Sequence, residues 1–490
     1  MANRYEQSWV FRGDQDQENI GDAQFIGMDQ KTDDPAGMQP GFTRLLQNAR
    51  INNGSLVTRN GMFPPASFNN VSYGTIYGAG IFSDPNSLEY LLLVVSSGVW
   101  AIRVGSDPTF IGLGNGVATI AGPCHAVQAF GNIILFLGAT INPLFWNGNF
   151  TGTFDALPLP SIDENQIPPS PTGTYAYSRV WIPWGKSNLA ASNLGIFYQY
   201  DPNFGALNID DGRDDNLVTT VPWLDQSLVA FKTQSCYALQ NVAGDLGTPT
   251  PPSTTVDLTG LPNLQPLVQG IGLVGKRAWC YVGTDIWFMS QQGVYSIMQK
   301  VQASPQVSSV PLSDLLKNTI NQINWNASSG IVAAYRKERI YFAIPLGNST
   351  RNNSLIVYNL VNSAWESVDT FDATQGFCPD ELYVTDYLGD RRIFAIDFIQ
   401  GIVLLLEEGP TDVYYTSAAA SPSGVNERQI QFQFVSRGYT GPGDRNNFKR
   451  LSANIATFNP DFTITATTDS EALAVTVFPP GNMNNSPVQT

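Results

Sequence analysis

Short apolar runs separated by turn dipeptides recur from about residue 75 to residue 409, and this repetition constrains the fold more than any other feature. The clearest copy contains the runs Ala278–Val282, Asp285–Ser290 and Val294–Ile297, joined by Gly283-Thr284 and by Gln291-Gln292-Gly293. Each run has the length and the β-branched or aromatic content of a strand, and each connection has the composition of a tight turn. We therefore expect hairpin-connected strands throughout this region.

Seven such clusters follow one another at a spacing of about 40 to 70 residues, the period of four-stranded propeller blades with variable loops. Several contain Gly, a β-branched residue and an aromatic in succession, where we expect Gly to supply a positive φ and the aromatic to re-enter the core. Sandwiches and barrels also consist of short strands, but they do not require this ending to recur. We therefore predict an all-β fold, a β-propeller of about six to seven blades. The endings are Gly98-Val99-Trp100, Gly195-Ile196-Phe197 and Gly293-Val294-Tyr295, and the other runs are Leu88–Val95, Val99–Val104, Ile133–Leu137, Leu144–Trp146, Arg179–Trp184, Gly195–Tyr198, Ser227–Lys232, Cys236–Leu239, Ile331–Tyr335, Arg339–Ile344, Leu355–Tyr358, Ala364–Val368, Leu382–Thr385, Arg392–Asp397 and Ile402–Leu406.

Three regions are predicted from the distribution of turn residues and apolar runs. Residues 1–72 are rich in Gly, Pro, Asn and Asp, yet apolar spots such as Leu46 and Ile51 favour an extended N-terminal arm that packs on the propeller or on neighbouring subunits over a disordered tail. Residues 73–409 form the propeller body. Residues 410–490 form a small C-terminal β-unit and a flexible tail. One helix is expected where Ser313 and Asp314 precede apolar residues at helical spacing up to Ile323, capped by these two residues and inserted between two blades.

The composition restricts the partners of this chain. Charged residues make up 14% of the chain, against roughly 25% in an ordinary domain, which suggests a surface covered by other subunits. The net charge is −15, so the chain is not expected to bind nucleic acid by neutralising phosphates. The four cysteines are widely separated and are expected to be buried free thiols. The N-terminus lacks the apolar run of a signal peptide, and no segment approaches the roughly 20 apolar residues of a membrane span, so synthesis in a cytoplasm is expected.

Candidate chemistry is sparse. The chain has one histidine, His125, which argues against histidine-dependent triads and histidine metal clusters, and no phosphate-binding loop or nucleophile elbow is present. No catalytic residue, cofactor or cofactor-binding residue is therefore predicted. An acidic cluster offers calcium ligands, although a solvated loop is the favoured interpretation. A carboxylate pair of the glycoside-hydrolase kind stays open, since several acidic residues that fit turns also fit that role. The one basic cluster could contact DNA or an acidic neighbouring subunit, although an ion-pairing edge strand is the favoured interpretation. The calcium candidates are Asp210, Asp211, Asp214 and Asp215; the carboxylate candidates are Asp369, Asp372, Asp380 and Glu381; the basic cluster is Arg445, Lys449 and Arg450.

The order of several loose packing and turn motifs resembles the tail nozzle, or packaged-DNA-stabilising, proteins of short-tailed bacteriophages. None of these motifs is a catalytic signature, and together they cover most of the chain. The motifs are Gln39–Phe42, Asn48–Ile51, Gly54–Gly61, Gly283–Ser296, Arg339–Pro345, Leu355–Asn359 with Trp365, Arg437–Tyr439 and Phe448–Leu451.

This resemblance implies a non-enzymatic structural protein of the virion tail, assembled as a homo-hexamer below the portal and the adaptor, or head-to-tail connector. The ring would continue the DNA channel, retain packaged DNA and open for ejection, with tail fibre or tailspike proteins as further partners. DNA would pass through the lumen without sequence-specific binding, which the net acidity suits, and no small-molecule substrate is expected. Two alternatives stay open: a receptor-binding or glycan-cleaving tail protein, and a propeller that serves as an interaction scaffold. The N-terminal arm and the trailing β-unit favour the nozzle, because both suit the joining of subunits.

Overall fold

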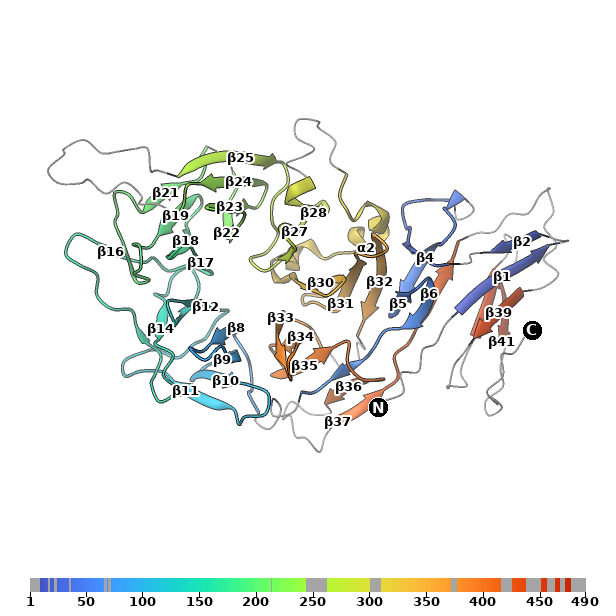
Figure 1. Ribbon diagram of the computed structural model, residues 1–490, viewed down its shortest axis with the longest axis horizontal. Helices are drawn as coiled ribbons and strands as arrows, with labels where there is room; N and C mark the ends of the chain where they lie inside the picture. The colour runs from blue at the N-terminus through green and yellow to red at the C-terminus, as the bar shows by residue number, and fades with distance from the viewer. Residues whose placement is uncertain are drawn as a thin grey trace.

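The computed structural model describes most of residues 9–476, and Figure 1 shows its strands arranged around a ring. The description leaves out residues 1–8, 16–17, 22–23, 35–36, 66–67, 69–71, 213, 244–261, 300–309, 372–376, 416–424, 438–450, 456–462, 468–471 and 477–490.

The body of the molecule is a β-propeller of antiparallel sheets, which agrees with the predicted fold class. Within the described residues, six blades have four strands each, and a three-stranded sheet lies between the fourth and fifth of these blades. In chain order the strands are β8 (Gly78–Ser83), β9 (Glu89–Val95), β10 (Gly98–Ile102) and β11 (Thr109–Gly112); β12 (His125–Ala129), β13 (Asn132–Phe136), β14 (Leu144–Trp146) and β15 (Asp155–Ala156); β17 (Thr174–Ala176), β18 (Arg179–Trp184), β19 (Asn188–Ala191) and β21 (Ala206–Asn208); β22 (Leu217–Pro222), β23 (Ser227–Lys232), β24 (Ser235–Gln240) and β25 (Asn263–Gln269); the three-stranded β26 (Trp279–Val282), β27 (Asp285–Ser290) and β28 (Gly293–Ser296); β29 (Val332–Arg336), β30 (Arg339–Ile344), β31 (Ser354–Asn359) and β32 (Ala364–Thr370); and finally β33 (Glu381–Tyr387), β34 (Asp390–Asp397) and β35 (Ile402–Leu406), completed by β7 (Met62–Phe63).

The ring closes where the last blade meets the first. Strand β7 comes from the N-terminal region and pairs antiparallel with β35, in the register Leu405↔Phe63 and Leu406↔Met62. The first blade then packs on the last through one apolar cluster that includes Leu91 and Phe394. A hydrogen bond from the Tyr383 hydroxyl to the Ala79 carbonyl, 2.8 Å long, joins the same two blades. Closure thus depends on a segment that precedes the propeller in sequence.

The remaining N-terminal strands add to the outer edges of the blades. Strand β4 (Phe42–Gln47) lies beside β32 and pairs in parallel with β3 (Gly27–Met28) and antiparallel with β38 (Gln433–Ser436). Strand β36 (Asp412–Tyr415) pairs with β7 and with β37 (Val425–Arg428). The chain ends therefore extend the two blades on one side of the ring.

A separate group of strands lies beyond these blades, to the right in Figure 1. Strand β1 (Trp9–Gln15) pairs with β2 (Glu18–Gly21), β6 (Ser55–Thr58) and β39 (Leu451–Ile455), while β5 (Ala49–Asn52) pairs with β6. The hairpin of β40 (Thr463–Thr467) and β41 (Ala472–Thr476) and, elsewhere in the ring, the pair β16 (Asn165–Gln166) and β20 (Gln199–Tyr200) complete the strands. The first and last parts of the chain thus share one sheet, here called the terminal unit.

The core is distributed between neighbouring blades instead of gathering at one centre. Large aromatic side chains fill the spaces between sheets, among them the fully buried Trp146, Trp181 and Trp365. This pattern is expected of a propeller, because each sheet can bury its two faces only against the sheets beside it.

The predicted helix is shorter than expected and is capped differently. Residues Asp314–Leu316 form a 3-10 turn (η3), Lys317–Asn321 form helix α2, and Trp325–Gly330 form a second 3-10 segment (η4). The prediction that Ser313 caps the helix is wrong: its hydroxyl instead accepts the backbone N–H of Val294, at 3.0 Å. That bond fixes α2 against β28, where Leu316 and Ile320 enter the core.

Two other predictions have clear outcomes. The four cysteines are free thiols; Cys124, Cys236 and Cys280 are buried, and Cys378 is half-buried. The predicted strand at Gly195–Tyr198 is wrong, because these residues form turns between β19 and β20. No helix among the described residues is long and apolar enough to cross a membrane.

Candidate functional site

A cluster of buried ion pairs fastens the N-terminal arm to the propeller, and Arg50 of β5 is at its centre. The Arg50 guanidinium donates to the Asp369 carboxylate in a bidentate arrangement, at 3.0 and 2.6 Å, and its Nε donates to Glu407 at 2.8 Å. Further bonds reach Glu407 and the Ala49 carbonyl, so five hydrogen bonds use all five donors of the group. Asp369 belongs to β32 and Glu407 follows β35, so one side chain joins the arm to two blades.

A second arginine repeats this arrangement a few residues later. Arg59 donates to both carboxylate oxygens of Asp412, at 2.8 and 2.6 Å, and to the Asn48 side chain at 3.0 Å. Its guanidinium also lies 5.6 Å from the ring centroid of Phe371. The arm and the start of the C-terminal segment are therefore held at the same place. We call the Arg50 and Arg59 ion pairs the clasp.

A buried glutamate beside the clasp contacts the backbone of the arm. Glu366 of β32 accepts the Ile51 backbone N–H and two bonds from Arg339, at 2.7 and 3.0 Å. On the neighbouring residue, the Ala49 N–H donates to the Ser367 hydroxyl at 3.1 Å. Side chains of β32 thus accept hydrogen bonds from backbone N–H groups of the arm. In a continuous β-sheet, carbonyls of a neighbouring strand would accept those bonds.

The electrostatics of the clasp favour its charged form. Burial by itself raises the pKa of Asp369, but the adjacent Arg50 outweighs this effect, and the pKa lies below its ordinary value of 3.8. The Asp369 side chain is only 1% exposed. Removal of one partner would leave an uncompensated buried charge, which costs about 3–5 kcal/mol in such pairs.

A second polar cluster lies where blades from opposite sides of the ring approach one another. Its residues are at the beginning of the first strand of each blade. The Lys276 ammonium, just before β26, donates to the carbonyls of Cys124 and Pro171, at 3.4 and 3.2 Å. Those residues precede the first strands of the second and third blades. Lys276 therefore extends across the interior of the ring and links the three-stranded sheet to the second and third blades.

Neighbouring groups complete this axial cluster. Arg277 donates to Glu381 at 3.2 Å and to the Leu382 carbonyl at 3.0 Å, and its guanidinium lies 4.4 Å from the ring centroid of Tyr383. Burial raises the pKa of Glu381, and the nearby Arg277 and Lys276 partly counter that effect. The cluster thus joins the three-stranded sheet to the last blade.

His125 belongs to the same region and is held neutral. Its Nδ1 lies 3.0 Å from the Thr172 hydroxyl. Burial lowers its pKa well below the ordinary value of 6.5, and the positive charges of Lys276 and Arg277 act in the same direction. His125 thus joins two blades; among the described residues its ring contacts a hydroxyl, whereas a catalytic triad places a carboxylate beside the histidine.

The four aspartates proposed as calcium ligands are placed in different surroundings. Asp215 is buried and accepts from the Thr233 hydroxyl and the Gln234 backbone, at 2.8 and 2.7 Å. Asp210 accepts the Tyr237 hydroxyl, and its backbone carbonyl accepts the Lys232 ammonium at 2.8 Å. Asp214 is exposed with Lys186 at 3.3 Å, and Asp211 is exposed. In the part of the chain that the structure describes, no three acidic, histidine or cysteine side chains are gathered as metal ligands.

The other predicted candidates divide between ion pairs and undescribed segments. Asp369 pairs with Arg50, Asp380 with Arg351 and Glu381 with Arg277. Asp372 and the basic cluster of Arg445, Lys449 and Arg450 lie outside the described residues.

The arginines of the clasp are not among the predicted site residues, although the sequence carries a signal for them. Arg50 and Arg59 lie within motifs that carried the resemblance, and Arg50 interrupts an apolar strand in a chain poor in charge. A charged residue in such a run is buried only with a partner. The Lys276-Arg277 pair directly before a strand carries a similar signal.

Comparison with known proteins shows a similarity of fold and nothing further. No protein-family model matches the sequence, and no curated protein matches it. Among solved structures, the extracellular domain of a putative hybrid two-component system from B. thetaiotaomicron is 13% identical over 69% of this chain, with a TM-score of 0.44. This chain spans 41% of that protein, less than half its length.

Two further structures are similar at the same level. A catalytically inactive virginiamycin B lyase from Staphylococcus aureus, with quinupristin, is 10% identical over 70% of this chain and 98% of its own, with a TM-score of 0.38. YCF48 from Cyanidioschyzon merolae is 12% identical over 71% of this chain and 98% of its own, with a TM-score of 0.37. Likeness at this level does not bear on what a propeller binds or does. The chain is accordingly described by its own strand pairing as an all-β propeller.

Proposed function

We propose that this chain is a structural subunit of a virion, the building block of the tail nozzle ring of a short-tailed bacteriophage. In this role a homo-hexamer lies below the portal and adaptor, continues the DNA channel, retains packaged DNA and opens for ejection. The proposal starts from the resemblance in sequence, and three features of the molecule support it.

The observation that carries the proposal is that the propeller has two unlike surfaces on opposite sides. The terminal unit lies on one side, and the loop of residues 157–164 that leads into β16, here called the β16 loop, lies on the other (Figure 1). This loop exposes Leu159 and Ile162 at 88% and 101% of their surface, and the Ser161 N–H and the Gln199 side chain hold it in place at 2.9 Å. A ring of identical subunits requires two different patches that complement each other head to tail. In the proposed ring, these two exposed apolar side chains are covered by the neighbouring subunit.

The axial cluster supports a particular position for the DNA channel. Because Lys276 extends across the interior of the propeller, the hole of one propeller does not suit passage of a duplex. In the proposed ring, DNA therefore passes along the axis between subunits. The net charge of −15 suits a lumen that repels phosphates.

The clasp supports a mechanical role. A subunit that resists the pressure of packaged DNA benefits from a closed ring of blades. Here the closing strand β7 directly follows a segment that Arg50 and Arg59 hold in buried ion pairs. Separation of the arm would leave several charges unpaired in the interior.

Electron cryo-microscopy of the source particle tests the proposal. We expect six copies of the chain around an axial channel, with the terminal unit of each copy against the β16 loop of the next. Light scattering on the purified chain gives the mass in solution. A stable trimer that cleaves polysaccharide would overturn the nozzle in favour of the glycan-cleaving alternative.

The carboxylates considered for that alternative are engaged elsewhere. Asp369, Asp380 and Glu381 each pair with an arginine, which leaves none of the three as the free acid of a hydrolytic pair. This arrangement favours the structural role.

A further inference from the structure

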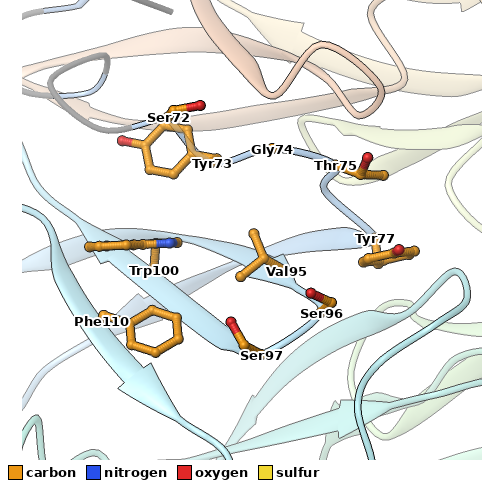
Figure 2. A pocket seen from close by; sticks show the side chains of 10 residues that line it. All are labelled: Ser72, Tyr73, Gly74, Thr75, Tyr77, Val95, Ser96, Ser97, Trp100 and Phe110. Carbon is orange, nitrogen blue, oxygen red and sulfur yellow. The ribbon is translucent and has the colours of Figure 1, made fainter. Parts of the chain in front are cut away.

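A hollow on the first blade has the features of a ligand site. It lies between the turn joining β9 to β10 and the segment that leads into β8, and its volume is about 570 Å³. Figure 2 shows the rings of Tyr73, Trp100 and Phe110 grouped toward one side of it, and Thr75, Ser96 and Tyr77 toward the other. Hollows that bind small molecules have volumes of about 300–1,000 Å³ and combine apolar walls with a few polar groups.

Three aromatic rings form the apolar wall. The centroids of Tyr73 and Trp100 are 6.0 Å apart with an edge-to-face geometry, and those of Trp100 and Phe110 are 5.0 Å apart. The Tyr73 hydroxyl donates to the Phe68 carbonyl, which fixes its ring. Phe110 is 40% exposed, and Trp100 is half-buried, so both rings are accessible from the hollow. Rings held in this way stack on a ligand at little cost in side-chain entropy.

The opposite wall consists of groups that form hydrogen bonds. Ser96 and Ser97 come from the β9–β10 turn and Thr75 from the facing segment, and all three side chains are exposed. Each hydroxyl offers one donor and two acceptor positions. Among the described residues, these three hydroxyls and the Trp100 indole N–H have no hydrogen-bond partner in the protein. All four groups are therefore available to a ligand.

Charge is missing from the lining, and this decides the class of ligand. None of the residues around the hollow is acidic or basic. A phosphate, sulfate or carboxylate would find no counter-charge there, and the net charge of −15 opposes any polyanion. The occupant must therefore be neutral, with an apolar face for the rings and several hydroxyl groups for the opposite wall.

We propose that this hollow is a binding site for a neutral oligosaccharide built of hexopyranose units. A pyranose ring presents a face of C–H groups, which stacks on Trp100 or Phe110, and equatorial hydroxyls, which reach Ser96, Ser97 and Thr75. The site binds without cleavage, since its lining offers no carboxylate pair. It adds a glycan-recognition surface to the structural role and does not depend on that role.

Ligand-observed saturation-transfer NMR on the full chain tests this site. The probes are maltohexaose, cellohexaose and a β-1,4-mannan hexamer as neutral oligosaccharides, a polygalacturonate oligomer as an anionic one, and a proline-rich decapeptide. We expect saturation transfer to at least one neutral oligosaccharide. Trp100→Ala should weaken that binding at least about tenfold, the loss expected from a removed aromatic platform.

Two further variants make the outcome decisive. Ser96→Ala with Ser97→Ala removes only exposed hydroxyls and should weaken binding while the melting temperature stays unchanged. Trp184→Ala removes a half-buried tryptophan of β18 outside the hollow and should leave binding unchanged. The proposal is overturned if no neutral oligosaccharide receives saturation, if the Trp100 and Trp184 variants bind alike, or if the peptide or the anionic oligomer binds better. Each of these outcomes leaves the nozzle proposal standing, because that rests on the particle.

Discussion

At the residue scale, the stability of the arm depends on a few buried charges whose hydrogen bonds are complete. Arg50 is 4% exposed and has two carboxylates and a carbonyl as acceptors, so its desolvation is offset only while all of them are present. Burial lowers the pKa of Arg50, but Asp369 and Glu407 reverse this, and the pKa is raised well above its ordinary value. The clasp is thus a set of mutually dependent charges, and no single member can be replaced without cost to the others.

Replacement of Arg50 should therefore be far more damaging than replacement of an exposed arginine. We expect Arg50→Ala to lower the free energy of unfolding by about 3–5 kcal/mol, because Asp369 and Glu407 are left in the interior without the arginine that pairs with both. Arg391→Ala is the matched control: the Arg391 side chain is 59% exposed, and its pair with Glu89 is expected to contribute about 1 kcal/mol or less. Urea denaturation followed by circular dichroism measures both, and equal losses would contradict a special role for the clasp.

His125 gives the chain a pH dependence of definite sign. Its pKa in the folded protein lies well below 6.5, so the unfolded chain binds a proton that the folded chain does not as the pH falls below that value. Stability should be complete above about pH 6.5 and should then decrease by about 1.4 kcal/mol per pH unit until the folded pKa is reached.

The variant His125→Gln isolates this contribution. Glutamine keeps a hydrogen bond to the Thr172 hydroxyl but does not titrate. Melting temperatures measured from pH 7.5 to 5.5 should fall more steeply for the wild type than for the variant. Parallel curves would mean that the histidine titrates normally in the folded protein.

At the element scale, the strands with two buried faces could be predicted from sequence almost to the residue. The bounds of β23, β27, β30 and β35 match the predicted runs, because each is a continuous apolar segment between turn residues. The strand Gly78–Ser83 was not among the predicted runs. Its Gly80 lies so near the second blade that a Cβ would come within 2.6 Å of the Ala126 side chain, a packing requirement that strand propensity opposes.

The prediction that glycine supplies a positive φ in the repeated Gly–β-branched–aromatic triplets is correct for some of them and not for others. Gly293 has a φ of 127° and needs the freedom of glycine, as predicted. Gly98 is required for a different reason: a Cβ there would lie 2.3 Å from the Ile111 carbonyl of the paired strand. Gly195 also has a positive φ, of 75°, but it begins no strand, because its neighbours lie in the turns before β20. Three similar triplets thus have three local causes, and the pattern alone could not separate them.

The clasp and the closing strand could not be predicted as a site, because their partners are more than 300 residues apart in the chain. Strand β7 has only two residues, too few for a periodic signal. The arm around it was predicted as an ordered segment from its apolar residues alone. Which strands pair over such a separation in sequence depends on the tertiary structure of the closed propeller.

The closing strand makes the arm essential to the propeller. Deletion of residues 1–63 removes β7 and the arm residues Leu46, Ile51 and Leu56, each worth about 1.5–3 kcal/mol when buried. We expect this truncation to melt well below the intact chain or to aggregate through the exposed edge of β35. Deletion of residues 1–23 is the control, since it removes β1 and β2 but spares β4 to β7, and it should change the melting temperature much less. A normal melting temperature for the longer truncation would refute the dependence of ring closure on the arm.

At the scale of the whole molecule, the chain combines a closed body with additions that lie off its axis. The blades pack against one another around the ring, whereas the terminal unit and the β16 loop extend from opposite sides (Figure 1). A propeller that bound its partner along its own axis would be expected to leave its interior open, but the Lys276 side chain extends across that interior. We therefore expect the contacts between subunits of the proposed ring to lie on the rim of the propeller.

The β16 loop is the rim feature that is open to a direct test. Leu159 and Ile162 are almost fully exposed, so replacing both with Asp should leave the stability of the isolated subunit within about 0.5 kcal/mol. In the proposed ring both side chains are buried, and the double variant would place two charges in an apolar contact, at a cost large enough to prevent assembly. Light scattering should therefore show the wild type as a ring and the Leu159→Asp, Ile162→Asp variant as a monomer. Leu388→Asp changes a side chain that is 76% exposed on the hairpin of the last blade and should assemble normally. If the double variant keeps the wild-type mass, the loop is not the contact, and the subunits of the ring must meet through another face of the propeller.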